Sequence, residues 1–380
     1  MTTTVNNEHK NIKVPNLRFK EFQGEWKEER LADIADLYKG TGISKEQLSD
    51  DGEPCILYGE LYTKYKSETI REVISKTNID NTKLVRSKAN DVIIPCSGET
   101  AEDIATARCV LNGNILLGGD LNIIRLHGYD GAFMSYQLNG KRKYDIAKVA
   151  QGVSVVHLYG EHLKGVKTIN PCLEEQKKIA SLLALLDERI STQSKIIDKL
   201  QSLIKGIAQK IVRSNKPNVR LSECLECNSS TLQESDVCEH GTYPVYGAND
   251  IVGYLNNYNT EGEAVYIIKD GSGVGTVSYV TGKCSATGTL NTLQAKEGYS
   301  LQYLYYLLKV FNFEPYKTGM AIPHIYFKDY GKAKFFCPSY TEQLQYAQSL
   351  SAIDSKLLVE KNILTSLSMQ KKYLLRQMFI

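Results

Sequence analysis

Hydrophobic positions along the chain follow two different periods. In residues 179–211 and 346–378, apolar side chains recur at alternating spacings of three and four residues. Sustained over roughly four to five heptads, so narrow a stripe is typical of a coiled coil. Elsewhere, short apolar runs such as 91–95, 114–117 and 264–268 are separated by turn-forming residues, which predicts short strands. The order along the chain is therefore globular, helical, globular, helical.

The two apolar stripes are the surfaces through which we expect the long helices to pair. Their central positions are Leu183, Leu186, Ile190, Gln193, Ile197 and Leu200, and Leu350, Ile353, Leu357, Glu360, Leu364 and Leu367. The long segment between the helices favours an antiparallel pair, in which Gln193 would lie close to Glu360. Such a buried polar contact fixes the register at some cost in stability. The alternative is that each helix packs on its own globular domain.

The second half of the chain repeats the first at an offset of 167 residues (319 minus 152). Gly152-x4-His157-x-Tyr159 recurs as Gly319-x4-His324-x-Tyr326, and Pro171-x3-Glu175-Gln176 as Pro338-x3-Glu342-Gln343. The long helices follow the same offset without a gap. A duplicated chain can form a pseudo-two-fold object, which suits a partner that is itself nearly two-fold, such as duplex DNA.

These patterns predict an α+β protein with two similar mixed α/β domains. Two long helices would join them as an antiparallel coiled coil with internal pseudo-two-fold symmetry. The predicted segments are residues 1–171 and 214–338 for the domains, and 172–213 and 339–380 for the helices. About 34 helical residues span roughly 50 Å. Such a rod could hold two DNA-reading domains about one duplex turn apart, roughly 34 Å.

Composition narrows the class of protein only modestly. The 380 residues carry a net charge of +3, and the positive excess lies on the helices and on flanking residues such as Lys10, Lys13 and Lys216. DNA binding would therefore depend on individually placed residues. No apolar run approaches a membrane span, so we expect no membrane partner. Nine cysteines without paired spacing fit a reducing cytoplasm.

The beginning of the chain carries a family likeness. Residues 14–26 (VPNLRFKEFQGEW) are followed by Arg30-Leu31, and Arg220-Leu221 echoes this pair at the start of the second globular segment. Together with the two Pro-x3-Glu-Gln segments that open the long helices, this order resembles the specificity subunit of type I restriction-modification enzymes. The resemblance covers essentially the whole chain. Its individual motifs are loose, whereas their order and repetition are specific.

The resemblance implies a non-catalytic subunit with two target-recognition domains. Each domain would read one half of a bipartite, asymmetric sequence in double-stranded DNA. The helices would set the spacing between the half-sites and dock two methyltransferase (modification) subunits, and motor-nuclease (restriction) subunits would join for cleavage. S-adenosylmethionine would belong to the methyltransferase subunits, and ATP and magnesium to the nuclease subunits. We expect no cofactor on this chain.

Motifs for catalysis or metal binding are weak. The string Asn170-Pro-Cys172 lacks the second proline and the aromatic residue of an adenine methyltransferase loop. The glycine-rich run 270–275 precedes a strand-like segment, whereas a phosphate cradle needs a helix there. Cys224, Cys227, Cys238 and His240 have the composition of a zinc site at an unusual spacing. Small buried or loop cysteines are the alternative, so we predict no catalytic or metal-binding residue.

Candidate DNA contacts are side chains with donors and acceptors on predicted loops. In the first domain they are Tyr58, Glu60, Tyr62, Lys64, Ser97, Thr100, Gln151, Ser154 and His157. In the second they are Tyr246, Asn249, Lys269, Ser272, Thr287, Thr289, Asn291, Lys317 and His324. The two histidines could instead fix the joint between domain and helix. The competing hypothesis for the whole chain is a coiled-coil adaptor that does not bind DNA.

Overall fold

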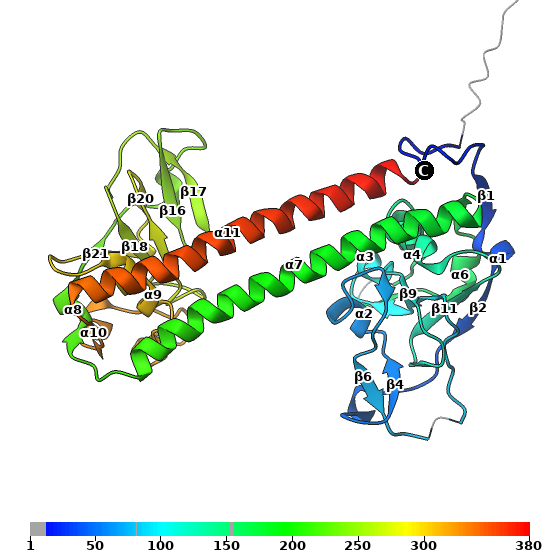
Figure 1. Ribbon diagram of the computed structural model, residues 1–380, viewed down its shortest axis with the longest axis horizontal. Coiled ribbons are helices and arrows are strands. Elements are labelled where there is room, and N and C mark those ends of the chain that lie inside the picture. The colour runs from blue at the N-terminus through cyan, green and yellow to red at the C-terminus, as the bar shows by residue number, and fades with distance from the viewer. Residues whose placement is uncertain (1–12, 81, 153–154) are drawn as a thin grey trace, which may run out of the picture. The chain divides into compact units, whose positions relative to one another are not determined.

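The chain forms two compact units in a computed structural model that describes residues 13–80, 82–152 and 155–380. Unit 1 consists of the chain up to Thr192 together with Leu364–Ile380, and unit 2 consists of Gln193–Ile363. Each unit therefore contains one globular domain and part of both long helices (Figure 1). The fold is the α+β arrangement that the sequence predicted, with two mixed α/β domains and two long helices.

The domain of unit 1 is built around a five-stranded sheet of order β2-β11-β7-β9-β5. These strands are β2 (Ala35–Lys39), β5 (Thr69–Ile70), β7 (Asp91–Pro95), β9 (Arg108–Val110) and β11 (Leu121–Leu126). All neighbours are antiparallel except β5 and β9. Every residue of β7 is buried, which explains its continuous apolar run. A second sheet, of order β10-β4-β6-β3, comprises β3 (Leu48–Ser49), β4 (Glu53–Ile56), β6 (Ser75–Thr77) and β10 (Leu116–Leu117).

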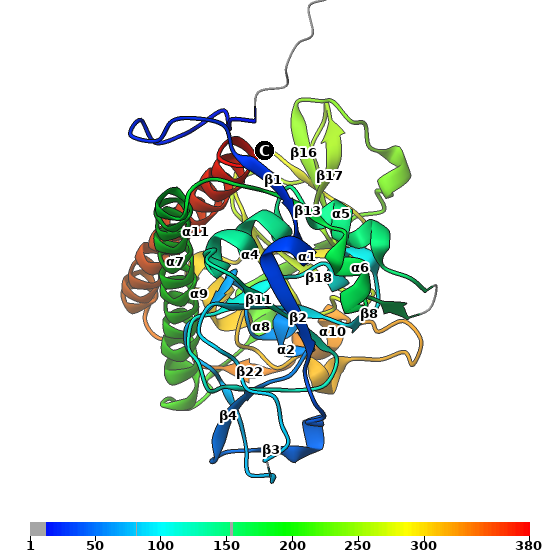
Figure 2. The ribbon, with the colours of Figure 1, turned by 90° about the vertical axis from the view of Figure 1, so that its right-hand side faces the viewer.

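Short helices and two-stranded ribbons complete this domain. The ribbons pair β1 (Lys27–Arg30) with β13 (Lys167–Asn170) and β8 (Ser97–Gly98) with β12 (Val156–His157). The helices are α1 (Leu31–Ile34), α2 (Glu60–Thr63), α3 (Ala101–Ile104), α4 (Gly131–Asn139), α5 (Lys143–Val149) and α6 (Gly160–Lys164). Figure 2, with unit 1 toward the viewer, shows β1 beside β13.

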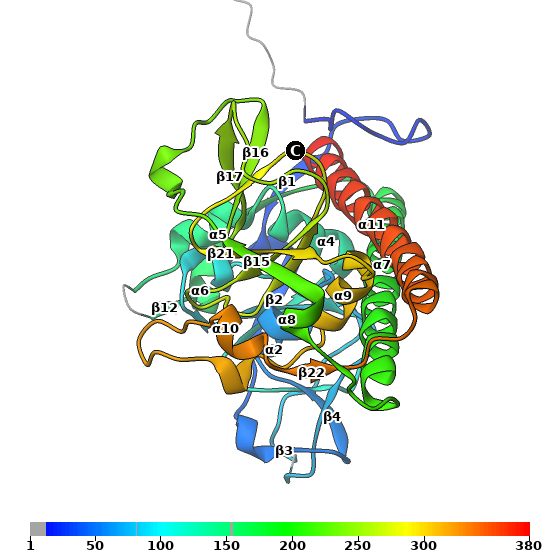
Figure 3. The ribbon, with the colours of Figure 1, turned by 90° about the vertical axis from the view of Figure 1, so that its left-hand side faces the viewer.

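The domain of unit 2 repeats this plan with fewer strands. Its main sheet has the order β15-β21-β18-β19, formed by β15 (Leu225–Ser229), β18 (Ala264–Ile268), β19 (Val277–Val280) and β21 (Leu290–Ala295). A smaller sheet contains β16 (Tyr243–Gly247), β17 (Asp250–Leu255) and β20 (Ser285–Ala286), and β14 (Val219–Arg220) pairs with β22 (Lys334–Phe335). The helices are α8 (Leu221–Cys224), α9 (Leu301–Leu308) and α10 (Phe327–Tyr330), and α9 lies beside the long helices (Figure 3).

The long helices are α7 (Leu173–Arg213) and α11 (Tyr340–Gln377). Acidic residues in the first turn of each helix and basic residues in the last turn complement the helix dipole. Within unit 1, Ile179 and Leu183 near the start of α7 pack with Met378 and Phe379, which directly follow the end of α11, so the helices are antiparallel there. Within unit 2, Gln193 Nε2 donates to Glu360 Oε2 at 2.5 Å and to the Glu360 carbonyl oxygen at 3.0 Å. The heptad pattern predicted this contact.

Each long helix also docks on its own domain, through the residues that repeat at the 167-residue offset. Gln176 accepts a hydrogen bond from the Asp130 N–H, at the start of α4, and donates to the Pro171 carbonyl. Gln343 accepts from the Ser300 N–H, at the start of α9, and donates to the Pro338 carbonyl. The helices therefore combine the two arrangements that the sequence analysis gave as alternatives. They pair with each other, and each packs on a globular domain.

A repeated aspartate makes the second contact between helix and domain. The Tyr136 hydroxyl on α4 donates to Asp187 Oδ2 at 2.7 Å, and the Tyr306 hydroxyl on α9 donates to Asp354 Oδ2 at 3.3 Å. The two aspartates lie 167 residues apart, like the glutamines. The strongest sequence repeat thus includes a structural joint between helix and domain.

The N-terminal arm, residues 13–26, packs against the end of α11 in unit 1. Trp26 lies edge-on to Phe133, which stacks on Phe379 near the C-terminus. The Arg18 guanidinium is 2.7 Å from the buried Glu175 carboxylate, and this bond raises the pKa of Arg18. In unit 2 the repeated Glu342 instead accepts from the Ser339 N–H and hydroxyl. The same glutamate therefore has different partners in the two units.

Candidate nucleic-acid interface

A tight hairpin is repeated in both domains, just before the last short helix of each. The backbones of Gln151 and His157 exchange two hydrogen bonds of 2.9 and 2.7 Å, and those of Thr318 and His324 do the same. Gly152 and Gly319 have φ of +126° and +87°. A Cβ at either position would also overlap a carbonyl oxygen across the turn. Glycine is therefore required here, which explains the repeated Gly-x4-His spacing.

The hairpins present apolar and aromatic side chains to solvent. Val155 in unit 1 and Ile322 in unit 2 are exposed and lie 167 residues apart, and Met320 in unit 2 is fully exposed. Tyr159 and Tyr326, at the starts of α6 and α10, are 51% and 48% exposed. A folded domain gains nothing from exposing such groups, so a surface that does so in both repeats is suited to a partner.

In unit 1 the hairpin joins several of the candidate residues. Ser97 in β8 pairs with His157 in β12, and the Tyr62 hydroxyl donates to the Ser97 carbonyl at 3.3 Å. Burial raises the pKa of Tyr62, so the hydroxyl stays a neutral donor. Thr100 caps α3, because its Oγ1 accepts from the Asp103 N–H. Tyr62, Ser97, Thr100, Gln151 and His157 thus belong to one region, whereas Ser154 lies outside the described residues.

Glu60 and Lys64 are engaged within the domain. The Glu60 side chain is buried, and its carboxylate accepts from the Leu57 N–H, the Lys64 ammonium at 2.7 Å and the Ser75 hydroxyl. Tyr58 is exposed beside them. Tyr58, Glu60 and Lys64 line a cleft of about 870 Å³, together with residues 42–48. In this arrangement Glu60 and Lys64 shape the wall of the cleft.

In unit 2 the hairpin gathers a comparable set. His324 Nδ1 lies 2.6 Å from Asp270 Oδ1, and the Ile325 N–H donates to the Lys269 carbonyl. The Lys269 N–H donates to the Thr289 carbonyl, and Ser272 is exposed in the loop that follows. Lys317 precedes the hairpin and forms an ion pair with Glu314. Lys269, Ser272, Thr289, Lys317 and His324 therefore lie around one hairpin.

The remaining candidates of unit 2 lie elsewhere in the domain. Thr287 and Asn291 are buried, and Asn291 Nδ2 donates to the Tyr330 hydroxyl at 3.1 Å. Tyr246 is half-buried against Tyr266, with ring centroids 5.7 Å apart. Asn249 is exposed in the turn between β16 and β17. Thr287 and Asn291 thus hold the sheet in place, whereas Asn249 is accessible.

Sequence reasoning overlooked the hydrophobic members of the candidate interface. It searched for donors and acceptors, and so it omitted Val155 and Ile322, included Met320 only as the end of the candidate loop 317–320, and used the two repeated tyrosines only as part of the repeat. The signal was present in the sequence, because the Gly-x4-His-x-Tyr spacing repeats although neither histidine is a buried core residue. Repetition of exposed residues, rather than their polarity, would have identified this surface.

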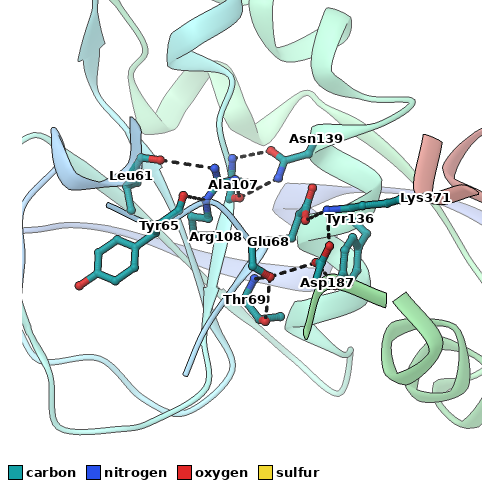
Figure 4. A network of polar contacts seen from close by, with 11 residues as sticks. Leu61, Tyr65, Glu68, Thr69, Ala107, Arg108, Tyr136, Asn139, Asp187 and Lys371 are labelled. Atoms are coloured by element: carbon teal, nitrogen blue, oxygen red, sulfur yellow. Dashed lines mark hydrogen bonds and ion pairs between the residues drawn. The ribbon is translucent and has the colours of Figure 1, made fainter. Parts of the chain in front are cut away.

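A buried charged cluster fixes the helices to the domain of unit 1 (Figure 4). The Lys371 ammonium lies 2.5 Å from Glu68 Oε2 and 2.6 Å from Asp187 Oδ1. Asp187 also accepts hydrogen bonds from the hydroxyls of Tyr136 and Ser67. Burial raises the pKa of Glu68. Burial acts to lower the pKa of Lys371, but the two carboxylates outweigh it and leave that pKa above its ordinary value.

The cysteines and histidine considered for zinc are dispersed. Cys224 is buried, and its thiol contacts the Arg220 carbonyl at 3.5 Å, while Cys238 and His240 are exposed in the segment between β15 and β16. Across the described ranges, no three His, Cys, Asp or Glu side chains converge in a way that could hold a metal ion. In the same part of the chain, no helix is both long and apolar enough to span a membrane.

Comparison with known families matches almost the whole chain. The family model described as "Type I restriction modification DNA specificity domain" matches twice, at residues 23–202 and 214–369. The chain is 27% identical over 199 residues to the type I restriction enzyme MjaVIII specificity subunit of Methanocaldococcus jannaschii, covering 51% of this chain and 44% of that protein. It is 26% identical over 113 residues to the EcoprrI specificity subunit of Escherichia coli, covering 30% and 28%. The matched part is thus less than half the length of each of these relatives.

A solved structure shares the fold over nearly its full length. The crystal structure of the S subunit of a type I restriction-modification system from M. genitalium superposes with a TM-score of 0.70 at 20% sequence identity. The match covers 97% of this chain and 99% of the other. At this identity the likeness shows the fold alone.

Proposed function

Because the chain belongs to the family of type I restriction-modification DNA specificity domains, we propose that it reads a bipartite, asymmetric sequence in double-stranded DNA. Each recognition domain reads one half of the target. The chain is a non-catalytic subunit that gives sequence specificity to methyltransferase and nuclease partners. S-adenosylmethionine binds to the methyltransferase subunits, and ATP and magnesium bind to the motor-nuclease subunits.

The observation that carries this proposal is the repeated hairpin. Both domains present it on the same scaffold, with a required glycine, a histidine and an exposed tyrosine. The residue that pairs with the histidine differs, however, being Ser97 in one domain and Asp270 in the other. Two domains that read different half-sites can share the contacts that position them on the DNA backbone. They need different side chains for the base contacts, because these determine which sequence is bound.

The long helices support the second part of the proposal, docking of two methyltransferase subunits. Their paired faces are buried, yet Leu185 on α7 and Leu358 and Val359 on α11 are exposed. Exposed apolar side chains on a helix whose other face is already packed favour a protein partner. A modest net charge of +3 is consistent with DNA binding that is completed by partner subunits.

Methylome sequencing tests the proposal directly. Cells would carry this chain with its cognate methyltransferase, with and without deletion of the gene for this chain. We expect a bipartite methylated motif that disappears on deletion, and exchange of residues 214–338 for another recognition domain should change only one half of it. Unchanged motifs despite an active methyltransferase would contradict the specificity role and favour a coiled-coil adaptor. DNA affinity of the assembled complex should also fall with salt.

A further inference from the structure

Strand β19 of unit 2 is an open edge where unit 1 has a further strand. The sheet of unit 2 ends at β19, whereas in unit 1 the equivalent β9 is followed by β5. The N–H groups of Cys109 and Leu111 donate to the carbonyls of Glu68 and Ile70, at 2.8 and 3.1 Å. These two bonds attach the segment 67–70 to the sheet of unit 1.

The register identifies the corresponding groups in unit 2. Val92 pairs with Cys109 in unit 1, and Val265 pairs with Tyr279 at the same place in unit 2. Tyr279 and Thr281 therefore correspond to Cys109 and Leu111, and their N–H groups point away from β18. Within the described ranges, no backbone acceptor is paired with either group. A free strand edge of this kind is a template for pairing with another chain.

The space beside this edge is hollow in unit 2 and filled in unit 1. Two clefts of about 330 and 390 Å³ share Tyr305, Tyr306 and Asp354, and Tyr279 lines the first of them. In unit 1, the equivalent Asp187 receives the Ser67 hydroxyl and the Lys371 ammonium. In unit 2, the residue 167 positions before Lys371 is Ile204, which lines the second cleft.

We infer that the β19 edge and its clefts bind an extended segment of the methyltransferase subunit, which pairs with β19 as β5 pairs with β9. This inference rests on the proposed function and names a contact within it. The segment Ser67-Glu68-Thr69-Ile70 of unit 1 shows which side chains such a site accepts. Its serine hydroxyl donates to Asp187, its glutamate pairs with Lys371, and its last two residues pair with β9.

Charge favours an acidic segment. Lys205, Lys309 and Lys361 line the second cleft, and Asp354 is its one acidic residue. An incoming carboxylate would meet these lysines as Glu68 meets Lys371, and an incoming hydroxyl would donate to Asp354 as Ser67 does to Asp187. Strand addition supplies the backbone hydrogen bonds, and these side chains supply the selectivity.

Hydrogen exchange of the full chain, alone and with the cognate methyltransferase subunit, tests the inference. We expect slower exchange at the amides of Tyr279 and Thr281 in the complex. Thr281→Pro removes one pairing donor and should weaken methyltransferase binding about tenfold, whereas the matched Thr281→Ala, which keeps the N–H, should stay within about twofold. Lys309→Glu, which opposes an acidic segment, should also weaken binding about tenfold.

The outcomes separate this inference from the proposed function. Normal methyltransferase binding with unchanged exchange at both amides, and with equal affinities for the proline and alanine variants, would overturn the strand-addition site alone. Absence of any methyltransferase binding by the unaltered chain would overturn the proposed function and this inference with it. Thermal unfolding of Thr281→Pro is the folding control. If that variant unfolds early, the Lys309→Glu affinity and the exchange data decide.

Discussion

Single glycines in the hairpins constrain the backbone of the candidate interface. Gly152 and Gly319 combine a left-handed φ with a carbonyl oxygen where a side chain would begin, so each residue is constrained twice. Choosing candidates by side-chain polarity selected exposed and buried residues alike. Asn249 and Asn291 look equivalent in the sequence, yet one lies in an exposed turn and the other is buried beneath Tyr330. Exposure depends on neighbours that are distant in sequence, which is why candidate contacts could not be sorted beforehand.

Substituting Gly319 with alanine separates backbone strain from steric overlap. The left-handed φ alone costs about 1–2 kcal/mol, and overlap with the Ile322 carbonyl adds to it, for roughly 2–3 kcal/mol in total. The matched control is Gly262→Ala, where φ is +82° but nothing lies within 4 Å of the new Cβ. Thermal unfolding and DNA affinity should both suffer more for Gly319→Ala. Equal effects of the two substitutions would show that overlap in the hairpin is unimportant.

At the level of elements, the long helices were predictable and their attachments were not. The heptad pattern can be read from the spacing of residues within one helix, and it predicted the contact between Gln193 and Glu360. Lys371 is a polar residue within the same apolar stripe. Its partner Glu68 lies 303 residues away in sequence, just before strand β5, and no periodicity connects that segment with α11. A pattern read along one helix shows which face is buried, but it does not show which domain supplies the charges that meet it.

Removing Lys371 tests how strongly its cluster holds helix and domain together. Lys371→Met leaves Glu68 and Asp187 buried without the ammonium that contacts both carboxylates, so that only the Arg108 guanidinium still attracts them, and should destabilise unit 1 by about 3–5 kcal/mol at pH 7. Adding Glu68→Gln and Asp187→Asn should restore part of the loss, because the two buried carboxylate charges are removed, while the buried Arg108 guanidinium loses their attraction. Denaturant unfolding measures both variants, and a triple variant as unstable as the single one would refute the electrostatic explanation.

The same variant has a defined pH dependence. Burial raises the pKa of Glu68 even beside Lys371, and loss of the cation raises it further. An acid whose folded-state pKa is raised binds protons more readily when folded, so stability increases as pH falls through that pKa. The deficit of Lys371→Met should therefore shrink as pH falls from 7 toward 5. Unfolding midpoints of variant and unaltered chain across this range are the measurement, and a constant deficit would contradict the assignment.

The polar contact between the helices should specify register more than it stabilises them. The bond from Gln193 lowers the pKa of Glu360, which keeps its carboxylate charged as an acceptor. Replacing both residues with leucine should raise the unfolding midpoint while making the transition less cooperative, because slipped pairings become comparably stable. Denaturant unfolding reports both quantities. Unchanged stability with the same single register would argue against this role.

At the scale of the whole molecule, duplication gives two domains with the same scaffold but with different residues beside the repeated histidines. The helix joints are repeated almost atom for atom through Gln176 and Gln343, whereas Ser97 and Asp270 differ beside the repeated histidines. The sequence repeat predicted the shared architecture because identical residues make identical joints. It does not predict which bases the proposed recognition domains would read, because the residues beside the repeated histidines differ between the domains.

Substituting the repeated tyrosines tests whether the two proposed recognition domains bind DNA independently of each other. Tyr159→Ala and Tyr326→Ala each remove an exposed ring from one domain, and each should cost the assembled complex about 1–2 kcal/mol of DNA-binding free energy. If each domain reads its own half-site, the double variant should show the sum of the two losses within about 0.5 kcal/mol. Fluorescence anisotropy on a duplex with the full target supplies all four affinities. A clearly smaller combined loss would mean that the two tyrosines act on one shared event, which contradicts separate half-site recognition.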